Sequence, residues 1–497
     1  MPSNSDRMVQ QLQHDFQELI EYVTGEGAPS RTAYDVELTL FRRLLGLGAQ
    51  LLRLFFVTRA AVRPPEPVDA PDGARLPYHG QSPTSYYSVF GKVQFERHYF
   101  YAPGHGGVCP LDADLSLPPR CYSDLLRDWA EYCVTDESVD ETIKVLKRIL
   151  GLSLSKLALE TCAQEDAADV GAFYEQKAAP PPVVEGPILV IQADGKGVPM
   201  RRAERAANPA RLGKGQKRTK KKEAVVTAIY TIEPYWRTPQ EVVEALVRDL
   251  GGDKAAPRAS PPPSQRPVPV GKEVRATLEG KAVAVDRLIQ RVAQREGKPI
   301  HHRVALTDGA EPLQDQVGDR LPQFTLVLDL IHASEYLWDA ANALLGETHP
   351  DRTAWVGEQL GHLLAGNTPE VIETLERLVQ DPSTSPSQRQ TLNTTIGYYR
   401  RNLPYMHYDQ YLAQGWPIGT GVVEGACGHL VKDRMEQAGM RWTQPGAQAI
   451  LDLRAVRIND DWEDYQQFRR QRQHQQLYGS HSFVVPWIEE TVLAQAA

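Results

Sequence analysis

ILVIQADGKGVPM, residues Ile188 to Met200, is the stretch that decides the fold. Its four leading aliphatic residues follow the breakers Pro181-Pro182 and Gly186-Pro187, and an apolar run of this length favours a buried central strand. The run ends at Asp194, which is followed by Gly195 and Gly197. Open α/β sheets place their chemistry at the carboxyl ends of such strands. The plainer alternative is an Asp-Gly turn that only ends the strand.

Composition limits the class of protein. With 497 residues, 41% hydrophobic and 24% charged, the chain is long enough for about three globular domains. A net charge of -8 argues against a uniformly basic surface, so DNA contact would need local patches. Five scattered cysteines without a Cys-x-x-Cys pair support neither a disulfide framework nor a zinc site, and fit a reducing cytoplasm. The polar N-terminus, and an apolar stretch at Leu44–Val57 broken by Arg53, predict no signal peptide and no membrane span.

The N-terminal half alternates between helical and β patterns. Helical spacing covers residues 6–61, and two aromatic runs around Gly91 predict a β-hairpin. Ser138 has the features of a helix N-cap and Gly151 those of a helix stop. Residues 138–174 therefore read as helix, turn, helix, which is compatible with a DNA-binding helix-turn-helix but is also the pattern of two ordinary packed helices.

After Asp194 the chain becomes strongly basic. This run favours phosphate contact with salt-dependent binding, although a solvated loop has the same composition. Further along, we expect strands at 225–232, 302–307 and 324–328, a helix over 274–296, and a disordered segment over 250–272. The basic run includes Arg201, Arg202, Arg205, Lys214, Lys217, Arg218, Lys220, Lys221 and Lys222.

Three carboxylates stand out by their positions. Asp194 and Asp308 each end an apolar strand pattern and precede a glycine. Paired carboxylates are what Mg²⁺ requires, and two such ions can stabilise the attacking and leaving oxygens of phosphoryl transfer. Glu424 lies in the first turn of an amphipathic helix, with Lys432 and Arg434 as phosphate partners. The ordinary alternative for Glu424 is a glutamate favoured by the helix dipole.

These motifs also carry a family resemblance. ADGKGVPM, TDGAEPLQDQV, LDLIHASEYLW and PIGTGVVEGACGHLVKDRMEQAGMRWT resemble a bacterial insertion-sequence transposase of the DDE class, ISKra type, which has a ribonuclease H-like core. GKVQFERHYFY and CPLDADLSLP resemble the N-terminal half of that family. The resemblance implies that Asp194, Asp308 and Glu424 form the metal-binding triad. It also implies that Asp329 and His332 are an Asp-x-x-His element beside the active site.

The second carboxylate has two candidates, since Asp329 also ends an apolar strand. We favour Asp308 because strand, Asp308, helix, strand is the order that the resembled core implies. Members of the family often carry a zinc ribbon at the hairpin. Here only His79, His105 and Cys109 are available, so zinc is not expected.

The predicted fold class is therefore a multidomain α/β protein with a ribonuclease H-like mixed sheet. An all-helical insertion interrupts this core, and helical and β-hairpin DNA-binding regions precede it. The expected domains are 1–61 (helical), 62–120 (hairpin, resembling a degenerate zinc ribbon), 121–180 (helix-turn-helix-like), 187–333 (core, first part), 334–414 (helical insertion), 415–460 (core with the glutamate helix) and 461–497 (tail).

The function implied by the resemblance is DNA cleavage and strand transfer at an element's terminal repeats, with two Mg²⁺ or Mn²⁺ ions. The partners would be double-stranded DNA and a second or further copy of the chain, in the bacterial cytoplasm. One alternative is a catalytically inactive or repurposed DNA-binding protein of the same fold. A phosphohydrolase with an aspartyl nucleophile is disfavoured, because the acid needed two residues after Asp194 is replaced by Lys196.

Overall fold

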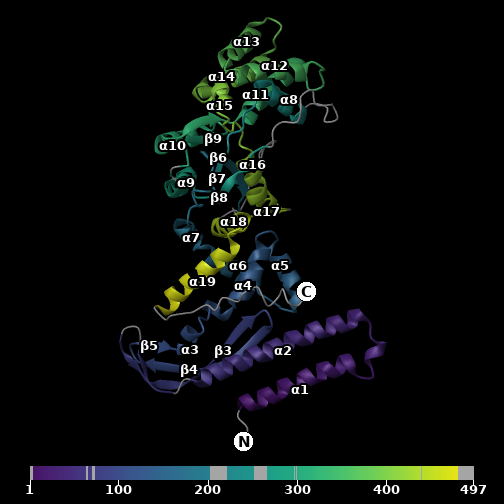
Figure 1. Cartoon of the computed structure of the whole chain (residues 1–497), viewed down its shortest axis with the longest axis vertical. Helices are drawn as coiled ribbons and strands as arrows, with labels where there is room; N and C mark the ends of the chain where they lie inside the picture. Colours follow the sequence, from purple (N-terminus) through teal and green to yellow (C-terminus); the bar gives the residue numbers. More distant parts are fainter. Residues whose placement is uncertain are drawn as a thin grey trace, which may run out of the picture. The chain divides into compact units, whose positions relative to one another are not determined.

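The chain folds into two compact units in a computed structural model (Figure 1). One unit comprises Met1–Asp169 together with Asp461–Ala497, and the other comprises Val170–Asp460. The structure describes residues 4–62, 65–69, 73–201, 221–250, 266–295, 297, 299–437 and 439–479, without side chains at 248–250. Most of the basic run, from Arg202 to Lys220, lies outside the described residues.

The first unit combines a helical hairpin, small antiparallel sheets and a helical cluster. Its three-stranded sheet has the order β3-β4-β5, and β1 pairs with β2. The N-terminal helices and the β-hairpin turning just before Gly91 agree with the sequence prediction. Its elements are α1 (Asn4–Thr24), η1 (Ala28–Ser30), α2 (Ala33–Val62), β1 (Val68–Asp69), β2 (Arg75–Leu76), β3 (Tyr78–Ser88), β4 (Gly91–Ala102), β5 (Gly106–Val108), α3 (Pro110–Asp114), η2 (Pro119–Cys121), α4 (Asp124–Val134), α5 (Val139–Leu150), α6 (Lys156–Ala167) and α19 (Trp462–Tyr478).

Capping residues set the helical cluster of this unit as expected. The Ser138 side chain accepts a hydrogen bond from the Glu141 backbone N–H, and Gly151 ends α5 in the left-handed conformation. The second helix is shorter than predicted. It begins after Ser155, ends at Ala167, and Val170 starts a separate helix in the second unit.

The C-terminal helix α19 is not the solvated end that its basic composition suggests. Arg469 is buried and makes ion pairs with Asp166 of α6 and Asp124 of α4, at 3.1 and 3.0 Å. Arg127 pairs with the same Asp166 through two nitrogens. Because these charges neutralise one another, a polar helix can be buried here.

The second unit contains a five-stranded mixed sheet and most of the helices. Its elements are α7 (Val170–Gln176), β6 (Ile188–Pro199), β7 (Lys221–Ile232), α8 (Pro239–Leu250), β8 (Val270–Thr277), α9 (Lys281–Arg295), β9 (His302–Thr307), α10 (Glu311–Arg320), β10 (Thr325–Leu328), α11 (Leu330–Leu345), α12 (Arg352–Leu364), α13 (Thr368–Gln380), α14 (Pro386–Asn402), η3 (Leu403–Tyr405), α15 (Tyr408–Ala413), α16 (Gly421–Ala426), the π-helical turn η4 (Cys427–Lys432), α17 (Asp433–Met435) and α18 (Gln444–Ile458).

The sheet has the order β10-β9-β6-β7-β8, so the stretch that opened the sequence forms the central strand. Strands β6, β9 and β10 are parallel, whereas β7 pairs antiparallel with both β6 and β8. Residues 188–193 are all buried. A central strand covered on both faces is expected to be continuously apolar.

Alternating residues of β6 contact different layers of helices. Leu189 and Ile191 pack with residues of α9 and α10 on one face, and Figure 1 shows these two helices next to the sheet. Ile188 and Val190 belong to a core with α11–α15, the helices between β10 and α16. Asp194 has the same parity as Ile188 and Val190, so it belongs to this second face. The predicted helical character of residues 334–414 is confirmed.

Two predictions about secondary structure were wrong. Residues 274–277 belong to strand β8 and not to a helix, which starts only at Lys281. The strand pattern was hidden because β8 buries two charged residues: Glu273 pairs with Arg291 at 2.9 Å, and Arg275 lies over the Tyr174 ring. Strand β8 also begins inside the segment expected to be disordered, of which residues 251–265 lie outside the described part.

One helix of the first unit bears on the expectation of no membrane span. Among the described residues, only α2 is long and apolar enough to cross a membrane by length and composition. Two of its faces are occupied: α1 lies along one, and on another Phe56 stacks on Phe95 of β4 with ring centroids 4.2 Å apart. Length and composition alone are therefore weak support for a span.

Candidate active site

Three aspartates directly follow the parallel-paired residues of three neighbouring strands, at the same level of the sheet. Ala193 of β6 pairs with Thr307 of β9, and Thr307 pairs with Leu328 of β10. The next residue of each strand is Asp194, Asp308 or Asp329. Neighbouring strands are about 4.8 Å apart, so the sequence positions of the three acids bring them to one edge of the parallel part of the sheet.

Asp194 does not end its strand, in contrast to the sequence prediction. The parallel pairing with β9 stops at Ala193, but the antiparallel pairing with β7 continues through Asp194 to Pro199. A side chain at Gly195 would collide with the Glu223 carboxylate of β7, and one at Gly197 with Lys221.

Asp194 and Asp308 each accept hydrogen bonds from neighbouring groups. Asp194 Oδ1 accepts a hydrogen bond from the Gly195 N–H at 2.6 Å, and its Oδ2 accepts one from the buried Cys427 thiol at 3.3 Å. Burial and the neighbouring Asp194 charge raise the pKa of the Cys427 thiol, so it remains a neutral donor. Asp308 Oδ1 accepts from the Ala310 N–H at 2.9 Å.

Asp329 is fully buried and caps helix α11. Its Oδ2 accepts hydrogen bonds from the backbone N–H of His332 and lies 2.6 Å from His332 Nδ1. The hydrogen bond with Asp329 raises the pKa of His332 to about 9, against the opposing effect of burial. His332 is therefore a cation near neutral pH and balances the buried carboxylate.

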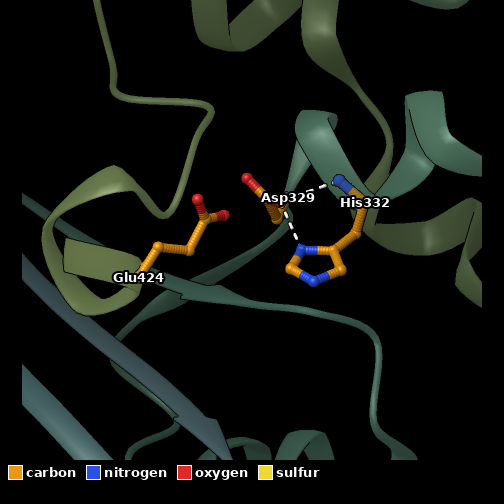
Figure 2. A group of neighbouring side chains, drawn as sticks. All are labelled: Asp329, His332 and Glu424. Carbon is orange, nitrogen blue, oxygen red and sulfur yellow. Dashed lines mark hydrogen bonds and ion pairs between the residues drawn. The ribbon is translucent and has the colours of Figure 1, made fainter. Parts of the chain in front are cut away.

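Glu424 reaches this pair from the other side, as Figure 2 shows. Ligand atoms of Asp329, His332 and Glu424 all lie within 4.8 Å of one another. Within the described residues, this is the group whose spacing could hold a metal ion, and it includes neither Asp194 nor Asp308. Binding of a cation by His332 would require loss of its proton, whereas the two carboxylates are ready oxygen ligands.

Two residues that the sequence did not single out position Glu424. Thr420 is buried, and its hydroxyl donates to Glu424 at 2.7 Å while its backbone N–H donates to Asp329 Oδ1 at 2.8 Å. Gln192 of β6 accepts from the Val423 N–H at 2.9 Å. The first turn of α16 is thus fixed to the central strand. In the sequence, the only feature that could have indicated this role of Gln192 is that it is a polar residue inside an otherwise apolar run.

Helix α14 of the helical insertion holds the backbone at Asp308 and Gly309 by hydrogen bonds. The Tyr398 hydroxyl of α14 donates to the Asp308 carbonyl at 2.9 Å, and Arg401 donates to the Gly309 carbonyl at 2.9 Å. Gly309 has φ +87°, and a side chain there would lie 2.8 Å from the Tyr398 hydroxyl. The Asp-Gly pair is therefore required by both conformation and space.

The basic residues proposed for DNA contact are in different situations. Arg201 is exposed at the end of β6, and Lys432 is exposed on η4. Lys221 pairs with Glu436, and Lys222 donates to Gln444 at 2.7 Å. Arg434 differs because it is buried, with its guanidinium 4.8 Å from the Trp442 ring centroid.

Comparisons with known proteins place few limits on this site. No family model and no curated protein matches the chain. Among solved structures, the Drosophila P element transposase strand transfer complex is similar over 72% of this chain and 81% of that chain, at 8% identity and a TM-score of 0.23. A TM-score this low establishes neither a shared fold nor a shared function.

Proposed function

We propose that the chain is a DNA transposase that cleaves and joins phosphodiesters with metal ions held by Asp194, Asp308 and Glu424. The observation that carries the proposal is the strand register. It brings Asp194 and Asp308 level on neighbouring parallel strands, and Gln192 fixes the turn bearing Glu424 to the strand that bears Asp194. Distant segments of the chain thus supply three carboxylates to one edge of a sheet.

The order of the elements supports a ribonuclease H-like core. On one side of the central strand β6 lie β7, antiparallel to it, and β8, antiparallel to β7. On the other side lie the parallel strands β9 and β10, and a helical insertion separates β10 from the glutamate helix. This is the arrangement expected from the sequence resemblance to DDE transposases of insertion sequences.

The donor set fits a hard divalent cation. Carboxylate oxygens are the ligands that Mg²⁺ and Mn²⁺ prefer, and the proposed set consists of three carboxylates. When bound, two such ions would stabilise the charge on the attacking and leaving oxygens. In this assignment Thr420 orients Glu424, and the Asp329–His332 pair anchors Thr420.

Asp329 remains the rival for the second carboxylate. In its favour, it lies with Glu424 and His332 in one group of ligand atoms. Against it, Asp329 is fully buried and forms an ion pair with His332. Strand β10 is also one position further from β6 than β9 is. We therefore assign Asp308 as the ligand and Asp329 as its support.

The proposed partner is double-stranded DNA carrying the terminal repeats, bound by at least two copies of the chain in the cytoplasm. Arg201, Lys221, Lys222 and Lys432 would contact phosphates next to the carboxylates, together with the basic run of residues 202–220. We omit Arg434 from this set because it is buried against Trp442.

The deciding experiment is cleavage and strand transfer on labelled DNA from the two ends of the genomic segment that encodes the chain, with Mg²⁺ or Mn²⁺. Asp194→Asn and Glu424→Gln should each lower the rate by about 100-fold or more, since even the loss of a group that only orients a metal ligand costs 10- to 100-fold. Parent-like cleavage by both variants would refute the triad. DNA binding without cleavage by the parent protein would favour the inactive DNA-binding alternative.

Single Asn substitutions separate the two candidates for the second carboxylate. We expect Asp308→Asn to abolish cleavage and Asp329→Asn to retain residual activity. The reverse order would assign the metal to Asp329. Mn²⁺ binding, measured by electron paramagnetic resonance without DNA, gives a second readout that does not depend on knowing the repeats.

A further inference from the structure

The helical hairpin of the first unit exposes an apolar face that its own unit leaves uncovered. On α1, this face consists of Val9, Phe16, Ile20 and Val23, and these side chains are 39–56% exposed. On α2, it consists of Tyr34, Phe41, Leu44, Leu51, Phe55 and Val62, which are 42–72% exposed. Scattered exposed apolar residues are normal, but a continuous row along two helices marks an interaction surface.

The spacing of these residues is that of a helix-packing seam. Residues 9, 16 and 23 repeat every seven positions on α1, as do residues 34, 41, 55 and 62, and 44 and 51, on α2. A seven-residue apolar repeat keeps one row of side chains facing a partner helix. The missing member, position 48, is glycine because the Phe90 ring occupies that place: a Cβ on Gly48 would lie 2.6 Å from it.

The exposed apolar rows of α1 and α2 lie on the same side of the hairpin. Gln50 donates to Asp15 at 2.8 Å, and Arg43 lies over the Tyr22 ring, so α1 and α2 run antiparallel. At about 100° per residue, residues 9, 16 and 23 of α1 and residues 44, 51 and 62 of α2 lie roughly a quarter to a third of a turn from the row that faces the other helix, in the same rotational sense. Residues 20, 34, 41 and 55 lie further round in that sense, up to about half a turn. For antiparallel helices, equal senses of rotation bring the two rows to one side, and Figure 1 shows the two long helices side by side.

The charges of the two helices are compatible with a second copy of the chain as the partner. Helix α1 carries four carboxylates and one arginine, whereas α2 carries four arginines and two carboxylates. When two copies meet by this face, α1 of one copy can lie beside α2 of the other with opposite net charges. Complementary charge of this kind sets the pairing and orientation of helices.

The size of the face is sufficient for a stable dimer. Ten large side chains at roughly 80 to 100 Å² each, about half of a fully buried aromatic, supply on the order of 800 to 1,000 Å². A standard interface takes about 800 Å² from each partner. Lipid is a poorer occupant, because four arginines lie on α2 and its other two faces already contact α1 and β4.

We propose that this face joins two copies of the chain through a four-helix bundle built from α1 and α2 of each copy. The dimer forms without DNA or metal, so the inference is independent of the proposed function.

The test is the molar mass of the full chain, measured by light scattering after size exclusion, from about 1 to 100 µM and without DNA. The parent should elute with the mass of two chains. A Leu44→Glu/Leu51→Glu variant places carboxylates in the seam and should raise the dimer Kd by about 100-fold or more. Leu157→Glu is the matched control, since Leu157 is 72% exposed on α6, outside the face, and this variant should remain dimeric.

Circular dichroism melting must show that the double variant is folded, and a monomer that melts like the parent supports the proposal. A parent that stays monomeric over the whole range would overturn it. A double variant that stays dimeric would show that the dimer interface lies outside this face and would overturn the proposal. Flotation of the parent with neutral phosphatidylcholine vesicles would assign the face to lipid instead.

Discussion

At the residue scale, Thr420 links the two acidic groups of the candidate site. Its hydroxyl donates to Glu424, while its backbone N–H donates to Asp329. Because the backbone contact survives substitution, the two connections can be separated. Thr420 is thus a positioning residue, since it acts through Glu424.

Thr420→Val should weaken Mn²⁺ binding by about 10- to 100-fold, as expected for loss of a group that orients a metal ligand. Valine keeps the N–H bond to Asp329, so the loss of stability should be limited to about 1 kcal/mol, the usual net value of one hydrogen bond. Thr420→Ser restores the hydroxyl and should recover binding. Equal Mn²⁺ affinities for the valine and serine variants would show that the hydroxyl does not orient Glu424.

Glu131 gives a residue-scale prediction in the first unit. Burial, together with the negative charge of Asp166, raises the pKa of Glu131 above its usual value of 4.5, so the folded protein retains this proton at a pH where the unfolded chain has lost it. The stability that Glu131 contributes is therefore present below about pH 4.5 and is lost as the pH rises toward the raised pKa.

Glu131→Gln should flatten the fall of melting temperature between about pH 5 and pH 8, because glutamine resembles the protonated acid and cannot ionise. The matched control is Glu137→Gln at an exposed position, which should keep the slope of the parent. An unchanged slope for Glu131→Gln would mean that Glu131 is already ionised in the folded protein.

At the element scale, helix α14 of the insertion supports the loop after β9. Two adjacent tyrosines of α14 each donate a hydroxyl hydrogen bond to a backbone carbonyl. Tyr398 donates to Asp308, in the loop after β9, and Tyr399 donates to Ala333 of α11 at 2.7 Å. The insertion therefore contributes to the position of the second carboxylate as well as to the core.

Tyr398→Phe and Tyr399→Phe should each destabilise the second unit by about 1 kcal/mol, the usual net value of one hydrogen bond. Only Tyr398→Phe should also lower the cleavage rate, because of the two tyrosine hydrogen bonds only that of Tyr398 holds Asp308. Chemical denaturation and DNA cleavage measured on the same preparations separate the two effects. A similar loss of activity in both variants would show that Tyr398 affects cleavage only through the stability of the second unit.

At the scale of the whole molecule, the chain leaves the first unit at Asp169 and returns to it at Asp461. The returning helix α19 brings Arg469 to the buried Asp166, whose pKa is lowered by Arg469 and Arg127 although burial opposes this shift. The N-terminal unit is therefore completed only by the last described helix, after the second unit has been made.

Arg469→Met should destabilise the first unit by about 1.5 to 3 kcal/mol, the usual value of a hydrogen bond to a charged group, because Arg127 still pairs with Asp166. Mn²⁺ binding by the second unit should remain as in the parent. The measurement is calorimetric unfolding together with Mn²⁺ titration, with Arg472→Met, at a more exposed ion pair with Asp169, as control. If the first unit of Arg469→Met unfolds at the same temperature as that of the parent, its stability does not depend on the ion pairs made by α19.

Local patterns in the sequence determined most of the elements. The apolar run at Ile188, the caps at Ser138 and Gly151 and the helical stripes of residues 334–414 depend on neighbours a few positions apart, so propensity and periodicity find them. The acids Asp194, Asp308 and Asp329 were recognisable for the same reason, since each directly follows an apolar run.

Only the tertiary structure decided which groups meet. Strand β8 was hidden because Glu273 and Arg275 are buried by partners that are distant in the sequence, such as Arg291. The contacts of Thr420 and Gln192 with the glutamate helix, and the burial of Arg469 in α19, arise in the same way. A polar residue reads as exposed in the sequence, and its burial follows only when the folded chain supplies the opposite charge or the hydrogen-bond partner.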